Sequence, residues 1–453
     1  MAAQPDAEAE DTQGSGPDQE LPEIELLTLR DGLPRVVETP EALAAAVADI
    51  AAGTGPVAID AERASGYRYS ARAYLIQLRR QGSTTHLIDP IAFDDLAPLH
   101  QTLVGTEWIL HAASQDLACL REVGLQPSSL FDTELAARLL GYPRVGLAAL
   151  VESLCGLRMR KEHSAADWSK RPLPTAWLDY AALDVEVLVE IRDVLAQELV
   201  DSGKLDWARQ EFAHVMTQRP SPRTDPWRRT SGMHKARGRR SVAAVRELWL
   251  ARDEIAARRD VTPGRIIPDS AIVIAANALP SDRDALLGLK GFHGRGAERY
   301  ADTWMRALRT VRVMPDQDLP PMALRSDGPP PPRAWIDRNP EAAARLATAR
   351  AGLTELSQER SVPLENLLTP DVVRRVLWTP PQTRDPDTLT TALAEQLTAM
   401  GARPWQVELV SPVLREAILN PKPAAEVAPA EVELVPPSTE EATEEFLEPP
   451  DDA

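Results

Sequence analysis

The sequence predicts an α/β domain followed by two all-α domains, and three observations carry this prediction. In the first part of the chain, short apolar runs such as 57–59 and 108–110 alternate with segments of helical periodicity, as in a sheet covered by helices. Beyond residue 240, apolar residues recur three and four apart, as in 241–259, which is typical of amphipathic helices. Two proline-containing segments, 216–240 and 316–332, separate these regions.

The first predicted strand ends in two acids. Residues 57–59 read Val-Ala-Ile after a turn that contains glycine and proline, and Asp60 and Glu62 follow. Because residues two apart on a strand share a face, both carboxylates point the same way. The sequence therefore predicts a pair of acids at the end of one strand.

Two more acids follow in later elements. Residues 108–110 predict a second strand, which leads into Ser114 and Asp116, and these open a helix over 117–123. Residues 177–195 have the periodicity of a helix, on which Tyr180 and Asp184 are four apart and share a face. A phenol is thereby placed beside a carboxylate.

Four acids in three segments are the ligands that a pair of divalent metal ions needs for attack on a phosphodiester. Taken singly, each acid is more simply explained as a helix cap or a solvated surface group. Together, Asp60, Glu62, Asp116 and Asp184 predict a phosphodiesterase centre.

These segments resemble the three motifs of the 3′–5′ exonucleases with four acids, in the subclass whose third motif is Tyr-x-x-x-Asp. The surrounding residues make the chain similar to the ribonuclease D family over about residues 35–200: Leu-Ile-Gln-Leu at 75–78, Leu-His-Ala at 110–112, Asp-Trp at 167–168 and Arg-Pro-Leu at 171–173. The resemblance implies a ribonuclease H-like α/β fold with a mixed sheet. Here the four acids would hold two Mg²⁺ or Mn²⁺ ions, and Tyr180 would orient the attacking water.

The same resemblance implies a 3′–5′ exoribonuclease that releases nucleoside 5′-monophosphates from RNA with a free 3′ end, such as transfer RNA precursors or other small structured RNAs. Two alternatives stay open. One is a DNA 3′–5′ exonuclease, because the same acids serve DNA enzymes. The other is a catalytically silent RNA-binding adaptor, against which the presence of all four acids and Tyr180 argues.

One residue departs from the family pattern. Relatives usually have an aromatic residue after the first-motif glutamate, where this chain has Arg63. A guanidinium can stack on a base or pair with a phosphate. Tyr67, Tyr69 and Tyr74 are candidates for the missing ring. The departure bears on base contact and leaves the metal ligands intact.

The net charge of −18 is located in the tails. Residues 1–26 carry eight acids and 423–453 carry ten, with no basic residue in either, so the rest of the chain is neutral. Both tails have the composition of disordered segments. Within the neutral part, the segment 216–240 is basic, which predicts contact with a phosphate backbone, although a merely solvated linker is the alternative. The candidate nucleic-acid contacts in and before it are Lys170, Arg171, Arg228, Arg229, Lys235, Arg237, Arg239 and Arg240.

The segments 266–269 and 289–292 resemble the HRDC domain, a small helical nucleic-acid-binding module, in which Lys290 and Arg295 would belong to a basic face. A merely solvated helix surface is the alternative for these charges. A weak repeat of this region about 100 residues later predicts a second HRDC-like domain without a comparable basic cluster. The predicted organisation is an acidic tail (1–26), exonuclease domain (27–215), basic linker (216–240), HRDC domain (241–315), proline-rich linker (316–332), second HRDC-like domain (333–421) and acidic tail (422–453).

The two cysteines, Cys119 and Cys155, lie in apolar contexts without a CxxC or Cys/His partner, so we expect neither a disulfide framework nor a zinc site. The sequence has no long apolar run, and its N-terminus is acidic where a signal peptide would be basic. We therefore expect a cytoplasmic protein without membrane contact, and a monomer.

Overall fold

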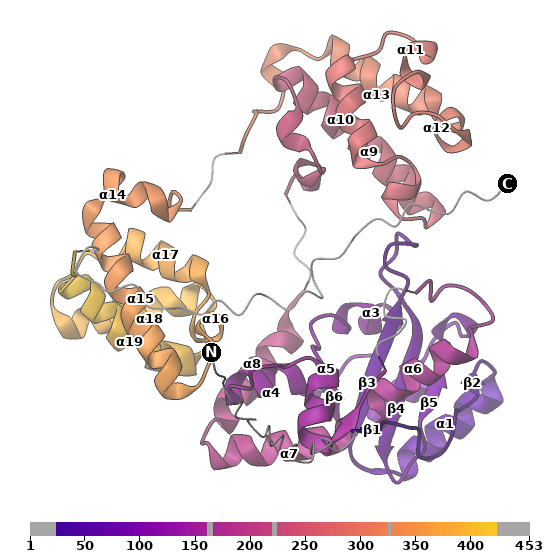
Figure 1. Ribbon diagram of the computed structural model, residues 1–453, viewed down its shortest axis with the longest axis vertical. Helices are drawn as coiled ribbons and strands as arrows, with labels where there is room; N and C mark the ends of the chain where they lie inside the picture. Colours follow the sequence, from indigo (N-terminus) through magenta and orange to yellow (C-terminus); the bar gives the residue numbers. More distant parts are fainter. Residues whose placement is uncertain (1–23, 161–165, 220–223, 325–327, 424–453) are drawn as a thin grey trace, which may run out of the picture.

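A computed structural model describes residues 24–160, 166–219, 224–324 and 328–423. The acidic tails predicted at 1–26 and 422–453 lie almost entirely outside the described residues. Within the described part, the chain folds into an α/β region followed by two helical regions (Figure 1). The predicted fold class is confirmed, whereas the exact domain boundaries stay predictions.

A six-stranded mixed sheet forms the centre of the α/β region. Its strand order is β2-β5-β4-β3-β6-β7; β3 pairs antiparallel with β4 and parallel with β6, and β4 pairs antiparallel with β5. A separate two-stranded sheet joins β1 to β8. The strands are β1 (Glu25–Leu26), β2 (Val36–Val37), β3 (Thr54–Arg63), β4 (Ala73–Gln81), β5 (His86–Ile88), β6 (Glu107–Leu110), β7 (Ser129–Asp132) and β8 (Leu157–Arg158).

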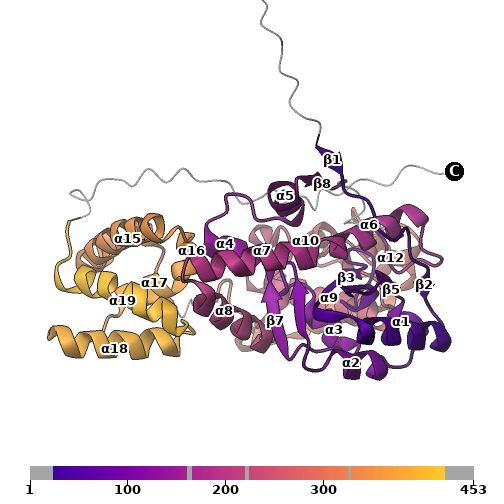
Figure 2. The same ribbon diagram turned by 90° about the horizontal axis from the view of Figure 1, so that it is seen from below.

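Helices cover both faces of the six-stranded sheet. Figure 2 shows α6 and α7 over one face and α1, α2 and α3 over the other. The helices are α1 (Pro40–Ala52), α2 (Ala97–Leu103), α3 (Leu117–Glu122), α4 (Thr133–Leu140), α5 (Leu147–Leu150), α6 (Thr175–Glu186), α7 (Leu188–Asp201) and α8 (Leu205–Thr217), with a 3₁₀ turn η1 (Pro90–Ala92) and a π-helical turn η2 (Val151–Cys155).

The middle strands β3 and β6 are buried because helices cover them on both sides. Val57, Ala58 and Ile59 of β3 are fully buried, as are Trp108 and Ile109 of β6. Each was part of a predicted strand, and β3 extends further than predicted in both directions, so that Asp60 and Glu62 lie within it. The single helix predicted over 177–195 is two helices, α6 and α7, which meet at Val187 with φ of −120°.

The first helical region is built around the long helix α9 and has its own core. Trp227 from the basic segment is buried against α9, in a cluster with Ala236 and Val242. Residues 224–238 of this segment, which we expected to be a basic linker, therefore fold onto α9 because they have an apolar side chain to bury. The elements are η3 (Pro226–Arg229), η4 (Met233–Lys235), α9 (Arg239–Arg259), η5 (Pro263–Arg265), α10 (Asp269–Ala278), α11 (Arg283–Leu287), α12 (Arg295–Arg299), α13 (Ala301–Val313) and η6 (Asp316–Asp318).

The second helical region packs on the α/β region and shares one hydrophobic core with it. Trp405 stacks on Trp207 of α8 with ring centroids 5.0 Å apart, and Glu211 accepts hydrogen bonds from Trp405 Nε1 (2.7 Å) and Arg403 Nε (2.6 Å). The backbone of Gly141 is so close to this region that an added Cβ would lie 2.7 Å from a carbonyl oxygen. The elements are η7 (Pro332–Ala334), α14 (Trp335–Arg338), α15 (Pro340–Arg360), α16 (Leu364–Leu367), α17 (Pro370–Trp378), α18 (Pro386–Ala399) and α19 (Pro404–Leu419).

Cys119 is buried, Cys155 is half-buried, and both are free thiols. Among the described helices, none combines the length and apolar character needed to cross a membrane. The cytoplasmic location stays a prediction.

Candidate active site

Asp60 and Glu62 project from the face of β3 that α6 covers. Ala58 on β3 and Ile109 on β6 form a buried cluster with Val185 of α6. Side chains alternate along a strand, so Asp60 and Glu62, two and four residues after Ala58, face the same helix. The small side chain of Ala58 leaves room for α6 to pack closely on the sheet. The two acids therefore lie on one face of β3, as predicted, and that face is opposite α6.

Asp184 of α6 completes a group of three carboxylates. One oxygen from each of Asp60, Glu62 and Asp184 lies within 4.8 Å of the others. All three offer only oxygen ligands, which hard divalent cations such as Mg²⁺ and Mn²⁺ prefer. The residues present therefore fit a divalent metal ion.

Asp116 stands on a loop that Asp132 holds in place. Asp132 accepts hydrogen bonds from the backbone N–H groups of Ala112 (3.2 Å) and Ala113 (2.8 Å), and its side chain also caps the N-terminus of α4. Ala112 has φ of 57°, a left-handed conformation that costs a non-glycine residue free energy and that these bonds stabilise. Sequence reasoning missed Asp132; its only local signal is an acid directly before the helix 133–140.

The carboxylate of Asp116 is buried and makes no capping hydrogen bond to α3, although it occupies the N-cap position. Its described ion-pair contact is with Arg63, whose Nε lies 3.9 Å from Oδ1. The fourth acid is not part of the group within 4.8 Å, but it is near enough for its charge to raise the pKa values of Glu62 and Asp184, and it faces a cation of the protein. Arg63, which we expected to contact nucleic acid, is directed at the acids.

Burial makes the four acids hard to ionise together. It raises the pKa of Asp60 to about 6, and it raises those of Glu62, Asp116 and Asp184 well above their ordinary values. Neighbouring carboxylates raise the pKa values of the last three further, while the positive charge of Arg63 lowers those of Asp60, Glu62 and Asp116. Such a cluster favours the binding of a cation, because a cation stabilises the ionised carboxylates.

Tyr180 lies on α6 one turn before Asp184, as its spacing predicted. It is half-buried and packs against a cluster that includes Trp168 and Tyr74. The phenol and the carboxylate therefore come from one face of one helix, which fixes their separation.

The three tyrosines considered as substitutes for the missing aromatic ring are all in contact with the first helical region. Tyr67 and Tyr69 lie in the hairpin that joins β3 to β4, and Tyr74 is the second residue of β4. The backbone N–H of Thr262 also donates to the carbonyl oxygen of Tyr67 (3.1 Å). The contacts are Arg265 over the ring of Tyr67 (4.5 Å), Tyr69 to Asp253 (3.1 Å) and Tyr74 to Asp260 (3.3 Å). These tyrosines hold two regions together.

Several predicted nucleic-acid contacts are occupied by partners within the protein. Arg171 donates two hydrogen bonds to Asp89, at 2.6 and 2.8 Å, and further bonds to backbone carbonyls. Arg228 lies over the ring of Trp227 and pairs with Asp225 at 3.1 Å. The remaining two occupied residues are Arg239, which bonds to Leu319 and Pro320, and Arg240, which bonds to Val311, Met314 and Asp316.

Other candidates are exposed and, among the described residues, have no carboxylate partner. They lie in separate places and the structure does not gather them around the four acids: Lys170 before α6, Arg229, Lys235 and Arg237 in the basic segment, and Lys290 before α12. The side chain of Arg295 lies outside the described part of the chain.

Three family models match the chain. Residues 34–200 match a 3′–5′ exonuclease domain, 241–308 an HRDC domain, and 328–418 a 3′ to 5′ exonuclease C-terminal domain. The first of these covers all five predicted catalytic residues.

Relatives and solved structures agree with these matches. The ribonuclease D of Gluconacetobacter diazotrophicus is 34% identical over 289 residues, which are 62% of this chain and 72% of that protein. A Bifidobacterium adolescentis protein of known structure has a TM-score of 0.79 and 35% identity, and the match covers 87% of this chain and 100% of that one. The structure of Escherichia coli RNase D, described as an exoribonuclease involved in structured RNA processing, has a TM-score of 0.63 and 26% identity. That match covers 86% of this chain and 99% of the other one.

Proposed function

Because the chain belongs to the ribonuclease D family and is a 3′–5′ exoribonuclease, we propose that it trims the 3′ ends of transfer RNA precursors or other small structured RNAs. The observation that carries the proposal is the convergence of Asp60, Glu62 and Asp184 within 4.8 Å, with Asp116 beside them. The structured-RNA part is supported by the described role of the Escherichia coli relative. The monomeric state stays a prediction.

We assign the metal site to the four acids. Asp60, Glu62 and Asp184 would hold one divalent ion, and Asp116 would supply the further ligand that a second ion needs. When bound, Mg²⁺ or Mn²⁺ supplies Lewis-acid activation of the attacking water and neutralises charge on the leaving 3′ oxygen. The carboxylates are buried between α6 and β3, which limits their contact with bulk water. This low-dielectric surrounding strengthens their attraction to a cation.

We assign to Tyr180 the orientation of the attacking water. A phenol has an ordinary pKa near 10, so its role at neutral pH is to hold the water by a hydrogen bond. Its place one turn before Asp184 puts it on the face of α6 that carries this carboxylate. Tyr180→Phe should therefore lower kcat while leaving the binding of metal and RNA largely unchanged.

A direct test compares RNA and DNA. A 3′-extended transfer RNA and a matched single-stranded DNA are incubated with the protein and Mg²⁺, Mn²⁺ or EDTA, beside the Asp116→Asn variant. We expect stepwise, metal-dependent shortening of the RNA that the variant lacks, with RNA binding retained. Asp193→Asn, at an exposed surface position, is the matched control.

The outcomes separate the alternatives. Equal loss of RNA and DNA would favour the DNA exonuclease, since the 2′-hydroxyl is the group that distinguishes the two substrates. Loss of RNA binding together with cleavage in Asp116→Asn would contradict the assignment of this residue as a metal ligand.

A further inference from the structure

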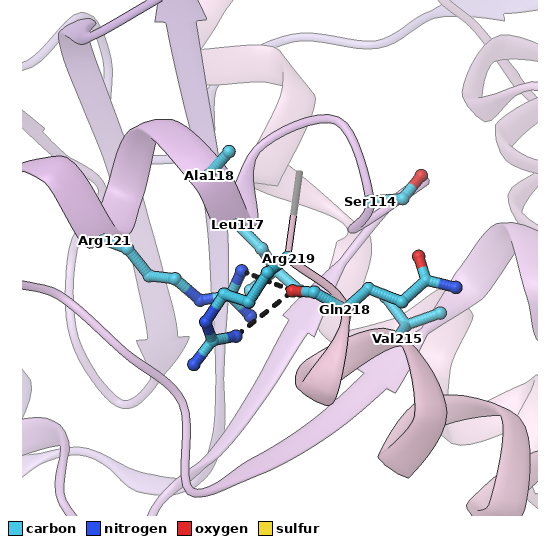
Figure 3. Close-up of a pocket in the computed structure, with 7 residues that line it drawn as sticks. All are labelled: Ser114, Leu117, Ala118, Arg121, Val215, Gln218 and Arg219. Atoms are coloured by element: carbon cyan, nitrogen blue, oxygen red, sulfur yellow. Dashed lines mark hydrogen bonds between the residues drawn. The ribbon is translucent and has the colours of Figure 1, made fainter. Parts of the chain in front are cut away.

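A small pocket lies between α3 and the C-terminal end of α8, where the chain leaves the α/β region (Figure 3). Its volume is about 170 Å³. No acidic side chain lines it, and its lining residues come from the loop that carries Asp116, from α3 and from the end of α8: Ser114, Leu117, Ala118, Arg121, Val215, Gln218 and Arg219.

Two guanidinium groups converge in this pocket. Arg121 donates to the carbonyl oxygens of Met216 (2.7 Å) and Gln218 (3.1 Å), and Arg219 donates to the same two oxygens (3.2 and 3.1 Å). Figure 3 shows both side chains directed at the carbonyl oxygen of Gln218. Two like charges thus share one pair of acceptors.

Neither arginine has a carboxylate partner among the described residues. Burial, and then the charge of Arg219, lower the pKa of Arg121, as expected for a cation beside another cation. The Nε of Arg121 is buried and has no hydrogen-bond partner in the described structure. One guanidinium group is enough to cap the carbonyl oxygens at the end of α8. The second guanidinium group is not needed for that role, and it adds a like charge without a carboxylate nearby, in the described part of the chain, to balance it.

The remaining polar groups at the pocket suit an anion. The side chains of Ser114 and Gln218 are exposed at its edge and supply hydroxyl and amide donors. Guanidinium groups bind phosphate through paired N–H donors, and most contacts to nucleic acids are made to phosphate and sugar. Ser114 lies two residues before Asp116 on the same loop. An anion bound in this pocket would therefore contact the loop that carries Asp116.

We propose that the pocket formed by Arg121 and Arg219 binds a phosphate of the RNA backbone and so fixes the substrate strand relative to the loop that carries Asp116. The proposal rests on the RNA substrate of the proposed function. The sequence predicted phosphate contact for the basic segment that contains Arg219, but not the pairing of Arg219 with Arg121, which lies on α3 about 100 residues earlier.

The test measures how RNA binding depends on salt. Binding of 3′-extended transfer RNA to the full chain is measured in EDTA, to prevent cleavage, over a series of salt concentrations. Loss of one phosphate contact should reduce the slope of log K against log salt by about 0.7 to 0.9. We expect Arg219→Gln to show this reduction and several-fold weaker binding at low salt. Arg209→Gln, an exposed arginine of α8, the helix that ends two residues before Arg219, should match the wild type.

Arg121→Gln serves as a second variant, with its thermal stability measured alongside because it also loses a cap of α8. A slope for Arg219→Gln equal to that of the wild type would overturn the pocket, as would an equal reduction in Arg209→Gln. If the wild-type protein itself does not bind the RNA, both this inference and the proposed substrate fail. A wild type that binds and cleaves RNA, with unaltered binding by Arg219→Gln, would refute the pocket alone.

Discussion

Arg63 should weaken the binding of metal at Asp116, and Arg63→Gln tests this. The guanidinium lies 3.9 Å from the carboxylate of Asp116, where a second ion would need a ligand. Its positive charge both competes for that carboxylate and repels a divalent ion from the cluster. Removing the positive charge of Arg63 should therefore strengthen the binding of a divalent metal ion by the four acids.

The size of the effect follows from the geometry. Two unit charges about 4 Å apart interact with about 4 kcal/mol at an effective dielectric constant of 20. The side chain of Arg63 is 31% exposed and that of Asp116 is 8% exposed, so solvent screens part of this interaction. We take about 1–2 kcal/mol as the remaining effect, which corresponds to roughly 5- to 30-fold in affinity.

The assay is a calorimetric titration of the metal-free protein with Mn²⁺, in the absence of RNA, for wild type, Arg63→Gln and Arg72→Gln. Arg72 lies at the other end of the hairpin that follows Arg63, and it is not among the charges that shift the pKa values of the acids. We expect tighter Mn²⁺ binding in Arg63→Gln alone. Unchanged or weaker binding in that variant would refute the reasoning, as would an equal gain in Arg72→Gln.

Two further predictions concern stability. Burial raises the pKa of Asp60 from 3.8 to about 6, so the folded protein favours the protonated carboxyl. The stability that this protonated group contributes is fully present below about pH 4 and is lost as the pH rises through about 6. Metal-free wild type should thus lose stability over this range relative to Asp60→Asn in denaturant titrations, and Mg²⁺ should restore it at neutral pH. Glu211→Ala leaves Arg403 unpaired and should cost about 3 kcal/mol. Urea unfolding against the exposed control Glu408→Ala measures this, and equal midpoints would contradict it.

Local periodicity was enough to predict the parts of the site that depend on one element. Asp60 and Glu62 share a face because they are two apart on β3, and Tyr180 and Asp184 share a face because they are four apart on α6. The periodicity of a helix does not predict which strand the helix packs against. The convergence of Asp116 and Asp184 with the first pair came from the family resemblance.

Arg63 shows where periodicity fails. Strict alternation along β3 places it on the face opposite Asp60 and Glu62. The register with β4 shifts between Glu62 and Arg63, and such irregularities bend a strand and redirect the side chains beside them. Together with the length of an arginine side chain, this accounts for its contact with Asp116.

The roles of the other arginines and tyrosines could not be predicted because their partners are distant in sequence. Arg171 pairs with Asp89, 82 residues away, and Tyr74 bonds to Asp260, 186 residues away. A basic residue in a flexible-looking segment has the same sequence signal whether it binds a phosphate or a carbonyl at the end of a neighbouring helix. Only the tertiary contacts distinguish the two.

The docking of the first helical region on the hairpin bears directly on the active site. This hairpin begins immediately after Arg63, and Asp260 fixes it by accepting hydrogen bonds from the backbone N–H of Ser70 (2.8 Å) and from Tyr74 (3.3 Å). Since Tyr67 and Tyr69 are also engaged with this region, the hairpin cannot turn a tyrosine toward a terminal base without breaking the contact. The helical region therefore constrains the segment next to Arg63, and the guanidinium of Arg63 is directed at Asp116.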